Sequence, residues 1–370
     1  MKFRLVELLQ CLRCHEPLEV SPERISERRP VTQEPFSCRH YCARHRTDRI
    51  PPASDCLECS GLEIETGRLI CRSCRHGYPI VDSVPRIMDE AAGRSDDRLS
   101  GTIALYSHLW TGQASVASDE SSHVEQVEDT LEEPVVRGRI GLDAGSGHGA
   151  DTLNMAARHP NVEVISLDIS EGVYETRWRT KALPNVHVVR ASVLSIPLRS
   201  GSCDFAYSFG VLHHTSDPKG GLAEIARTLK PGGLTALYLY EDHADNVWKA
   251  IPLKLVNGLR RITTGMNTRV LSGLCWLLSP VAFMTFTVPA RIMGWFRRTR
   301  PVAEKMPFSF GTSPLSLHGD LFDRLGAPIE VRYGREELAS LLASCGLVDI
   351  GITKFKVAAG WVARGVKAGA

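Results

Sequence analysis

Short apolar runs bounded by glycine, proline and polar residues recur through the middle of the chain and predict buried β-strands. One run ends at Asp143, is followed by the glycine-rich stretch 145–149, and gives way to a helix start. A second run ends at Asp168. Runs of this length between turn signals are typical of strands in a parallel sheet. The middle of the chain is therefore predicted to be an α/β domain.

Towards the C-terminus the pattern changes to helical spacing and then to two short strand-like runs. Apolar residues fall on one face of a predicted helix that begins after Gly334 and ends at Gly346; they are Leu338, Leu341, Leu342 and Cys345. Segments 347–356 and 358–366 then read as the strands of an antiparallel hairpin. These elements are expected to close the sheet of the central domain.

The glycine-rich turn suggests a binding site for a nucleoside-bearing ligand. Gly145, Gly147 and Gly149 alternate with other residues, which removes Cβ atoms where the backbone turns sharply and a ligand comes close. Amides at the start of the following helix can receive a polar or anionic group. The carboxylate of Asp168 can accept hydrogen bonds from ribose hydroxyls.

The turn reads Asp-x-Gly-x-Gly-x-Gly, which departs from the dinucleotide fingerprint and resembles the first motif of class I S-adenosylmethionine-dependent methyltransferases. Segments 160–170, 185–194, 203–214 and 229–234 resemble that family's second, third and fourth strands and its turn into the fifth. The resemblance implies a seven-stranded, mostly parallel, Rossmann-like sheet that binds S-adenosylmethionine. The cofactor-binding residues it implies are Asp143, Gly145, Ser146, Gly147, Asp168, Ile169, Ser192, Val193, Ser208 and Phe209. Ser192 stands where the family usually has an Asp that binds the adenine amino group.

His213 and His214, after the fourth predicted strand, are the candidate catalytic residues. A general base is needed only when the acceptor carries a proton that must leave. Leu-His-His is frequent at this position in methyltransferases with different acceptors, so a structural role is the favoured interpretation. The Asn/Asp-Pro-Pro-Tyr motif that grips base amines is absent, because this strand reads Ser208-Phe209-Gly210-Val211. DNA methylation is not expected.

Eight of the eleven cysteines fall in the first 74 residues, as four closely spaced pairs that suggest metal binding. Two thiolates separated by two or three residues can bind one tetrahedral zinc ion. A disulfide framework is the alternative, but the opening residues 1–7 lack the apolar core of a signal peptide, and a cytoplasmic protein is expected. The candidate ligands are Cys11, Cys14, Cys38, Cys42, Cys56, Cys59, Cys71 and Cys74, for about two zinc ions.

The pairing of these cysteines has two solutions. Segments 5–14 and 56–87 resemble the small zinc-ribbon methyltransferase activators, so the intervening insert either completes a first ribbon or splits one ribbon in two. Sequential pairing, the favoured reading, groups the first four cysteines and the last four. The interleaved pairing joins the outermost pairs and leaves the inner four for a second metal. His40 and His45 are expected at the surface, and Cys203, Cys275 and Cys345 are expected as buried thiols.

Residues 246–303 form an unusual insert with nine Lys or Arg and no Asp or Glu. Within it, Val270 to Ala290 is a run of 21 residues without charge, long enough to span a membrane. Pro280 and Pro289 are expected to break this run, and a single span would separate strands of one sheet. The remaining interpretations are an apolar lid with a basic rim, a helix pair on an anionic membrane surface, or plain packing.

The domain division follows from these segments. Residues 1–88 are predicted to be the zinc-ribbon domain, 89–134 a connector with N-terminal helices, 135–245 the cofactor-binding core, 246–320 the helical insert and 321–370 the closing elements. At 370 residues and 43% apolar content the chain can hold two or three domains, and a net charge of +2 gives no argument for nucleic acid.

The expected function is methyl transfer to a small, lipophilic or anionic acceptor. An RNA methyltransferase that uses the ribbons and the basic insert to hold phosphates is the alternative. The expected location is the cytoplasm, with the insert as a candidate for peripheral contact with the inner face of an anionic membrane.

Overall fold

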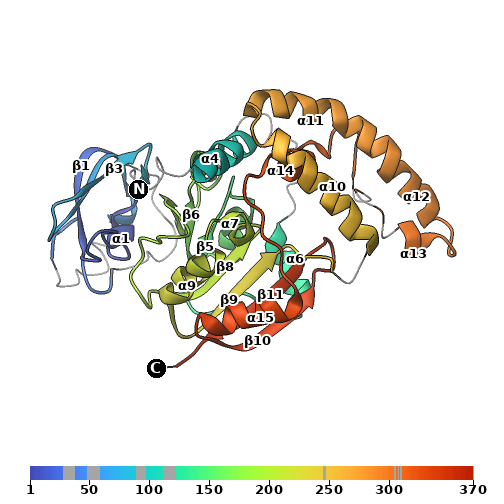
Figure 1. Ribbon diagram of the computed structural model, residues 1–370. Helices are drawn as coiled ribbons and strands as arrows, with labels where there is room; N and C mark the ends of the chain where they lie inside the picture. The colour runs from blue at the N-terminus through green and yellow to red at the C-terminus, as the bar shows by residue number, and fades with distance from the viewer. Residues whose placement is uncertain are drawn as a thin grey trace. The chain divides into compact units, whose positions relative to one another are not determined.

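The computed structural model describes residues 1–27, 38–47, 59–88, 97–111, 122–244, 247–303, 306, 308 and 311–369 (Figure 1). The chain forms two compact units. The first comprises the described parts of Met1–Asp96, Ser122–Asp242 and Glu330–Ala370, and the second those of Asp97–Ser121 and His243–Ile329.

The first unit contains a seven-stranded sheet in the order β10-β11-β9-β8-β5-β6-β7. Its five parallel strands are β5 (Ile140–Ala144), β6 (Glu163–Asp168), β7 (Val186–Arg190), β8 (Cys203–Phe209) and β9 (Leu229–Leu239). Strand β11 (Trp361–Lys367) pairs antiparallel with β9 and with β10 (Leu347–Lys354). The predicted seven-stranded, mostly parallel sheet with a closing hairpin is confirmed.

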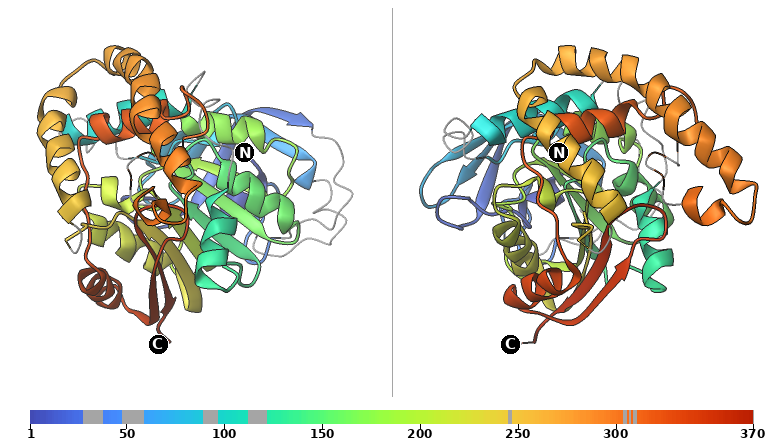
Figure 2. Two further views of the ribbon diagram at one scale, coloured as in Figure 1. Left: turned by 90° about the vertical axis from the view of Figure 1, so that its right-hand side faces the viewer. Right: turned by 45° about the vertical axis from the view of Figure 1, so that its right-hand side comes forward.

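Alternation along the strands directs apolar side chains to two hydrophobic clusters, one on each face of this sheet. Helices lie on both faces of the sheet (Figure 2). On β6, for example, Val164 belongs to one cluster and Ile165 to the other. One face receives α6 (His123–Leu131), α7 (Ala150–Arg158) and α8 (Gly172–Arg179). The other receives α9 (Pro218–Thr228) and α15 (Arg335–Ser344), the amphipathic helix that the sequence predicts.

The N-terminal domain is built on one long hairpin with an insert at its tip. Its four-stranded sheet has the order β1 (Leu18–Glu27), β2 (Leu62–Cys71), β3 (Gly77–Val81) and β4 (Val84–Pro85). Leu18 pairs with Cys71 at one end of the β1–β2 ladder, and Glu27 pairs with Leu62 at the other. The insert therefore splits a single ribbon, and the residues before β1 lie next to those after β2.

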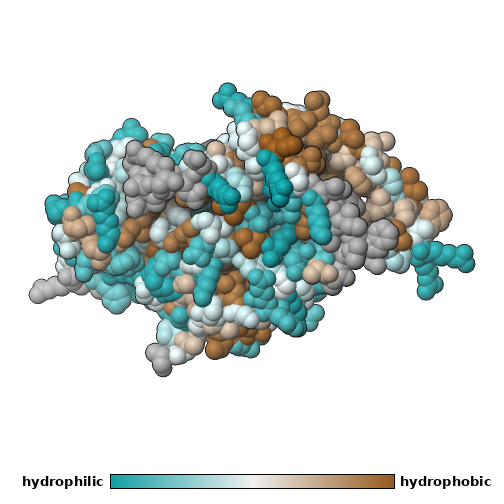
Figure 3. All heavy atoms as spheres, in the orientation of Figure 1, coloured by the Kyte–Doolittle hydropathy of each residue, from teal (hydrophilic) through white to brown (hydrophobic). Residues whose placement is uncertain are grey.

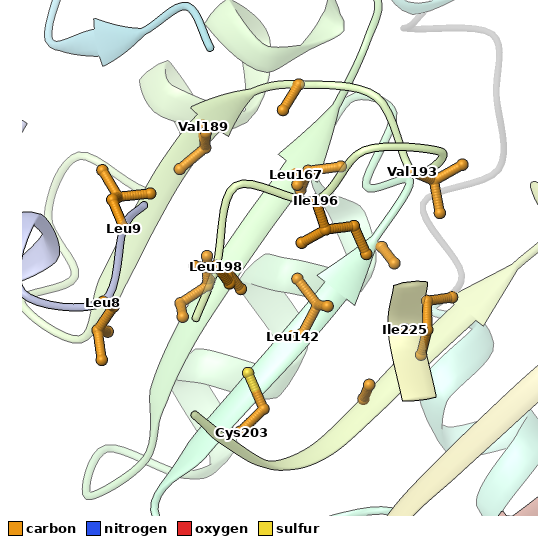
Figure 4. Close-up of a cluster of buried hydrophobic side chains, with 14 of the residues drawn as sticks. Leu8, Leu9, Leu142, Leu167, Val189, Val193, Ile196, Leu198, Cys203 and Ile225 are labelled. Carbon is orange, nitrogen blue, oxygen red and sulfur yellow. The ribbon is translucent and has the colours of Figure 1, made fainter. Parts of the chain in front are cut away.

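This N-terminal domain shares a core with the seven-stranded sheet. Helix α1 (Phe3–Val6) leads into Leu8 and Leu9, which join the cluster that contains Val189 and Leu198 (Figure 4). Leu9 forms a β-bridge with Leu198, in the connection between β7 and β8, which carries no helix over its described residues 191–202. The N-terminal domain thus covers the part of the sheet that a crossover helix would cover in a regular α/β unit.

The second unit is helical. Its elements are α4 (Asp97–Trp110), α10 (Val247–Thr263), α11 (Thr268–Ala282), the π-helix η2 (Phe283–Thr287), α12 (Val288–Gly294), α13 (Arg300–Ala303) and α14 (His318–Gly326). Leu105 and Leu109 of α4 pack in one cluster with Phe322 of α14. Helix α4, which the sequence assigns to a connector, therefore packs with the insert, as does α14.

The prolines do not break the charge-free run of the insert. Pro280 lies inside α11 and Pro289 at the start of α12, and the chain stays helical through both, with a π turn at Phe283–Thr287 between them. Within the described residues, Thr268–Gly294 is the one helix whose length and composition would allow it to cross a membrane.

Candidate functional site

The loop after β5 is held in a conformation that glycine favours. Gly145, Gly147 and Gly149 have φ angles of +99°, +54° and +86°, in the left-handed region. A Cβ atom on Gly145 would come closer than 3.0 Å to the side chain of Val211. The amide of Gly145 donates to the carbonyl of Leu167 at 2.7 Å, so the loop is anchored to the end of β6.

Asp168 fixes this loop from the neighbouring strand. One carboxylate oxygen, Oδ2, accepts from the Gly147 amide at 2.8 Å, and Oδ1 accepts from the Ser170 amide at 2.8 Å. The side chain is half-buried at the carboxyl end of β6. Each carboxylate oxygen has a second lone pair, so the group can still accept from a ligand hydroxyl.

Asp143 has a different environment from Asp168. Its carboxylate is 3% exposed and accepts from the Thr152 hydroxyl at 2.5 Å. Burial, and then the nearby carboxylate of Asp151, raise the pKa of Asp143 well above its usual value. The geometry ties the end of β5 to helix α7. Thr152 is not identified from the sequence as part of the site. The only feature of the sequence that could have indicated it is its position about one helical turn after Gly149.

The other candidate cofactor residues lie at the carboxyl ends of the adjacent strands. The Ser192 hydroxyl, after β7, accepts from the Leu194 amide at 3.2 Å, and Ser208 of β8 donates to the Ala144 carbonyl at 2.7 Å. The ten residues named from the sequence thus all lie at one edge of the sheet, in the last residues of β5, β6 and β8 or in the loops after β5, β6 and β7. The four not described above are Ser146, Ile169, Val193 and Phe209. The Ser146 hydroxyl is buried and lacks a hydrogen-bond partner among the described residues.

His213 is enclosed rather than exposed to this edge. Its ring is fully buried, with its centroid 3.9 Å from that of Tyr240 and 4.2 Å from that of His214. Neither ring nitrogen has a hydrogen-bond partner within the described chain. Burial, with help from the charges of His214 and Arg332, lowers the pKa of His213 well below its usual value. The ring is therefore neutral at physiological pH.

Four thiols of the N-terminal domain converge on one point. The sulfur atoms of Cys11, Cys14, Cys71 and Cys74 all lie within 4.8 Å of one another, with 3.6 Å between the sulfurs of Cys11 and Cys74 and 3.4 Å between those of Cys14 and Cys71. The favoured sequential pairing is therefore wrong, and the interleaved alternative is the one the fold assembles. The cause is the β1–β2 register, which sets the two outer pairs side by side.

Both outer pairs have the same local geometry. The residue after each second cysteine, His15 or Arg75, has a φ of 58°. The amide of each first cysteine donates to the carbonyl five residues further on: Cys11 to Glu16 at 2.9 Å, and Cys71 to His76 at 2.8 Å. Burial opposes ionisation of Cys11, but hydrogen bonds from the Tyr78 hydroxyl and backbone amides lower the pKa of its thiol to about 7. Four convergent thiols of this kind fit a tetrahedral zinc ion.

A second group combines Cys42, His45 and Cys59, whose candidate ligand atoms also lie within 4.8 Å of one another. The sulfur of Cys42 is 3.3 Å from Nδ1 of His45. His45 is exposed, as expected, yet its ring nitrogen belongs to this group. Its position three residues after Cys42 is the feature of the sequence that could have indicated a metal ligand. Cys38 is buried but is not in this group, and Cys56 lies outside the described residues.

Two family models match the chain, one over part of the seven-stranded sheet and one over the N-terminal domain. Residues 142–237 match the methyltransferase domain family, and residues 2–83 match the Trm112p-like protein family.

Among curated proteins, an uncharacterised 37.1 kDa protein in a transposon of Streptomyces fradiae is 43% identical over 98 residues, 26% of this chain and 28% of that protein. A ubiquinone/menaquinone biosynthesis C-methyltransferase of Syntrophotalea carbinolica is 37% identical over 100 residues, 26% of this chain and 41% of that protein. An O-methyltransferase of Penicillium expansum is 29% identical over 190 residues, 48% of this chain and 66% of that protein. The chain thus matches only part of the length of these relatives.

Among solved structures, a complex between the Haloferax volcanii Trm112 methyltransferase activator and a putative methyltransferase aligns with a TM-score of 0.43 and 14% identity. The alignment covers 71% of this chain and 98% of that chain. The protein combines an N-terminal Trm112p-like domain with a methyltransferase domain in a single chain.

Proposed function

We propose that the chain is an S-adenosylmethionine-dependent methyltransferase acting on a small, lipophilic or anionic acceptor. The observation that carries the proposal is the link between Asp168 and the Gly147 amide, 2.8 Å long. It joins a carboxylate to a glycine loop in the left-handed conformation, at the carboxyl edge of a parallel sheet. Ligands bind at that edge in open α/β folds, and the residues present fit a nucleoside with a charged tail.

Each candidate residue has a role in this proposal. Asp168 accepts from the ribose hydroxyls, and the backbone of Gly145 to Gly147 lies against the amino-acid portion. Ser192 and Val193 border the adenine, where a serine hydroxyl replaces the usual carboxylate. Asp143 positions the loop through Thr152. The remaining candidates, Ile169, Ser208 and Phe209, lie at the carboxyl ends of β6 and β8 and would border the bound cofactor.

The bound cofactor supplies a methyl group already activated on a sulfonium. The protein therefore has to align the acceptor about 3 Å from that methyl and to exclude water. A buried neutral His213 is a poor general base, since its pKa is held well below the usual value. This supports a packing role for His213 and an acceptor whose proton leaves without it.

The acceptor class is supported by the relatives, among which are a C-methyltransferase of quinone biosynthesis and an O-methyltransferase. RNA is the alternative, favoured by the nine basic residues without an acid at 246–303. Exposed side chains along α11 and α12 are mainly apolar, however. Single-stranded RNA is usually gripped by aromatic rings interleaved with basic residues.

The thiol clusters are proposed to hold structural zinc. Cys11, Cys14, Cys71 and Cys74 would complete one tetrahedral site, which suits a closed structural role. Cys42, His45 and Cys59 would supply three ligands of a second. Zinc at either site would fix the N-terminal domain and take no part in methyl transfer.

Incubation with methyl-labelled S-adenosylmethionine and fractionated cell extract tests the acceptor class. Label is expected in the lipid or small-metabolite fraction, and Asp168→Ala should lose transfer while Asp129→Ala, which alters an exposed carboxylate, should keep it. Label in RNA would establish the alternative. Label in no fraction, with cofactor binding intact, would point to a fold that has lost its chemistry.

A further inference from the structure

The helix formed by α11, η2 and α12 has an apolar surface on both sides. Its inner side contributes Leu271, Cys275 and Phe283 to the core of the second unit. Its outer side carries large apolar residues that are between half and three-quarters exposed, namely Val270, Leu277, Val281, Met284 and Ile292. The hydrophobic surface over α11 and α12 is visible in Figure 3.

These five exposed residues form one stripe, which we call the outer stripe. Within α11, at 3.6 residues per turn, Val270, Leu277 and Val281 fall within an arc of about 40° on an ideal helix. Leu274, which is half-buried, lies next to this arc. Met284 in the π turn and Ile292 in α12 are exposed further along. Trp295, which follows α12 and is 83% exposed, extends the outer stripe at its C-terminal end. Scattered exposed apolar residues are normal, but a continuous stripe along a helix of this length marks an interaction surface.

Basic residues stand at both ends of the outer stripe. Arg261 and Arg269 are exposed before it, and Arg297, Arg298 and Arg300 are exposed just after Trp295 and Phe296. Residues 246–303 contain no acidic side chain. An apolar strip flanked by cations and ending in exposed aromatic rings matches the boundary between lipid acyl chains and anionic headgroups.

A membrane-spanning arrangement does not fit the fold. Strand β9 precedes this helix in sequence and β11 follows it, yet Leu239 and Trp361 pair in one sheet. The inner side of the helix is also tied to its own unit, because Ser279 donates to the Pro314 carbonyl at 2.8 Å and Thr287 to the Phe308 carbonyl at 2.5 Å. The helix can therefore meet a bilayer only along its length.

We propose that α11 and α12 dock lengthwise on the surface of an anionic bilayer. The outer stripe enters the boundary of the acyl chains, and the flanking arginines pair with headgroup phosphates, each cation adding to the attraction. The inference rests on the exposed stripe and its charge pattern alone, so it stands or falls independently of the proposed methyl transfer.

Co-sedimentation of the zinc-loaded 370-residue protein with vesicles tests the proposal. Binding is expected to phosphatidylcholine vesicles that contain phosphatidylglycerol, to fall steeply as salt rises, and to be at least tenfold weaker with phosphatidylcholine alone. Leu277→Gln with Met284→Gln should weaken binding at least tenfold, and Arg297→Ser with Arg298→Ser severalfold. The matched control is Trp178→Gln, which removes a 62% exposed ring from the first unit and should leave binding unchanged.

A second measurement reports the position of the stripe. Lipids brominated near the headgroup are expected to quench the fluorescence of Trp295, and this quenched signal should be lost in Trp295→Phe. No binding of the wild type to anionic vesicles at low salt would overturn the proposal. So would a wild-type dimer that Leu277→Gln with Met284→Gln converts to a monomer, since a second copy would then cover the stripe. The variants are folded if they stay in solution when centrifuged without lipid and if their circular dichroism spectra match that of the wild type.

Discussion

Arg4 of the N-terminal domain and Glu163 of strand β6 form a buried ion pair, with 3.1 Å between Nη2 and Oε2 and less than a tenth of either side chain exposed. His187 of β7 lies 3.0 Å from the other carboxylate oxygen. Lys2 adds a bond from its Nζ to the Val186 carbonyl at 2.7 Å. These contacts make the N-terminal domain an integral part of the methyltransferase unit rather than an appended module.

Loss of Arg4 should destabilise the fold strongly. Removing one partner of a buried pair leaves an uncompensated charge and costs about 3–5 kcal/mol. Arg4→Leu is expected to lower the free energy of unfolding by that amount in chemical denaturation, and adding Glu163→Gln should recover part of it. The control is Arg24→Leu, which breaks the exposed pair with Glu65 and should cost less than about 1 kcal/mol. Equal losses in the two arginine variants would contradict this account.

Acid should weaken the same junction through His187. Burial is the largest cause that lowers the pKa of His187, to about 4 from its usual 6.5, although Glu163 opposes it. Between pH 6.5 and pH 4 the imidazole of His187 binds a proton in the unfolded chain but stays neutral in the folded chain. The free energy of unfolding is therefore highest above pH 6.5 and falls as the pH drops towards 4. The loss is up to about 3 kcal/mol, at 1.36 kcal/mol per pKa unit.

Denaturation of the wild type and His187→Gln between pH 7 and 5 checks this dependence. The variant is expected to lose less stability on acidification. Some dependence should persist, because burial also lowers the pKa of His148 to about 4. An identical pH slope in the two proteins would show that His187 is not buried in the neutral form.

Metal removal should weaken both the N-terminal domain and the sheet. The sequence predicts a separate zinc-ribbon domain at residues 1–88, yet Leu5, Leu9 and Ile64 share one hydrophobic cluster with Leu142 and Ile165. Chelation is therefore expected to lower the temperature of a single shared unfolding transition, because metal binding contributes to folding free energy. Two separate transitions, with the sheet unaffected, would restore the independent-domain interpretation.

Elemental analysis tests the metal ligands themselves. Two zinc ions per chain are expected in the wild type, and Cys74→Ser should lose one. Cys345→Ser is the matched control, because Cys345 lies outside both thiol clusters and its loss should leave both ions bound. His45→Ala should reduce zinc at the second site alone.

Gly145 should tolerate no side chain. A Cβ there would collide with Val211, and the φ of +99° strains any other residue. Gly145→Ala is expected to abolish S-adenosylmethionine binding by distorting the loop. Gly201→Ala is the control, since Gly201 has a φ of +64° with open space around it and should cost only about 1–2 kcal/mol of stability. Thermal unfolding and calorimetry of the two variants separate these effects.

The sequence predicts the sheet, the glycine loop and Asp168 because each depends on local pattern and on motif order. It does not predict the cysteine pairing, since the insert between β1 and β2 conceals the register that sets Leu18 opposite Cys71. Nor does it place α4 with the insert, because the contact of Leu105 with the Phe322 cluster joins residues far apart in the chain. Nor does it predict that the helix continues through Pro280, because a proline normally interrupts a helix and here the chain stays helical on both sides of it.

Calorimetric titration of S-adenosylmethionine tests the central claim most directly. The wild type is expected to bind, Asp168→Ala to bind more weakly by about 1.5–3 kcal/mol for the lost charged hydrogen bonds, and Asp129→Ala to bind as the wild type does. Equal affinity of Asp168→Ala and wild type would remove Asp168 from the site. Absence of any binding by the folded, zinc-loaded wild type would contradict the proposed methyltransferase activity.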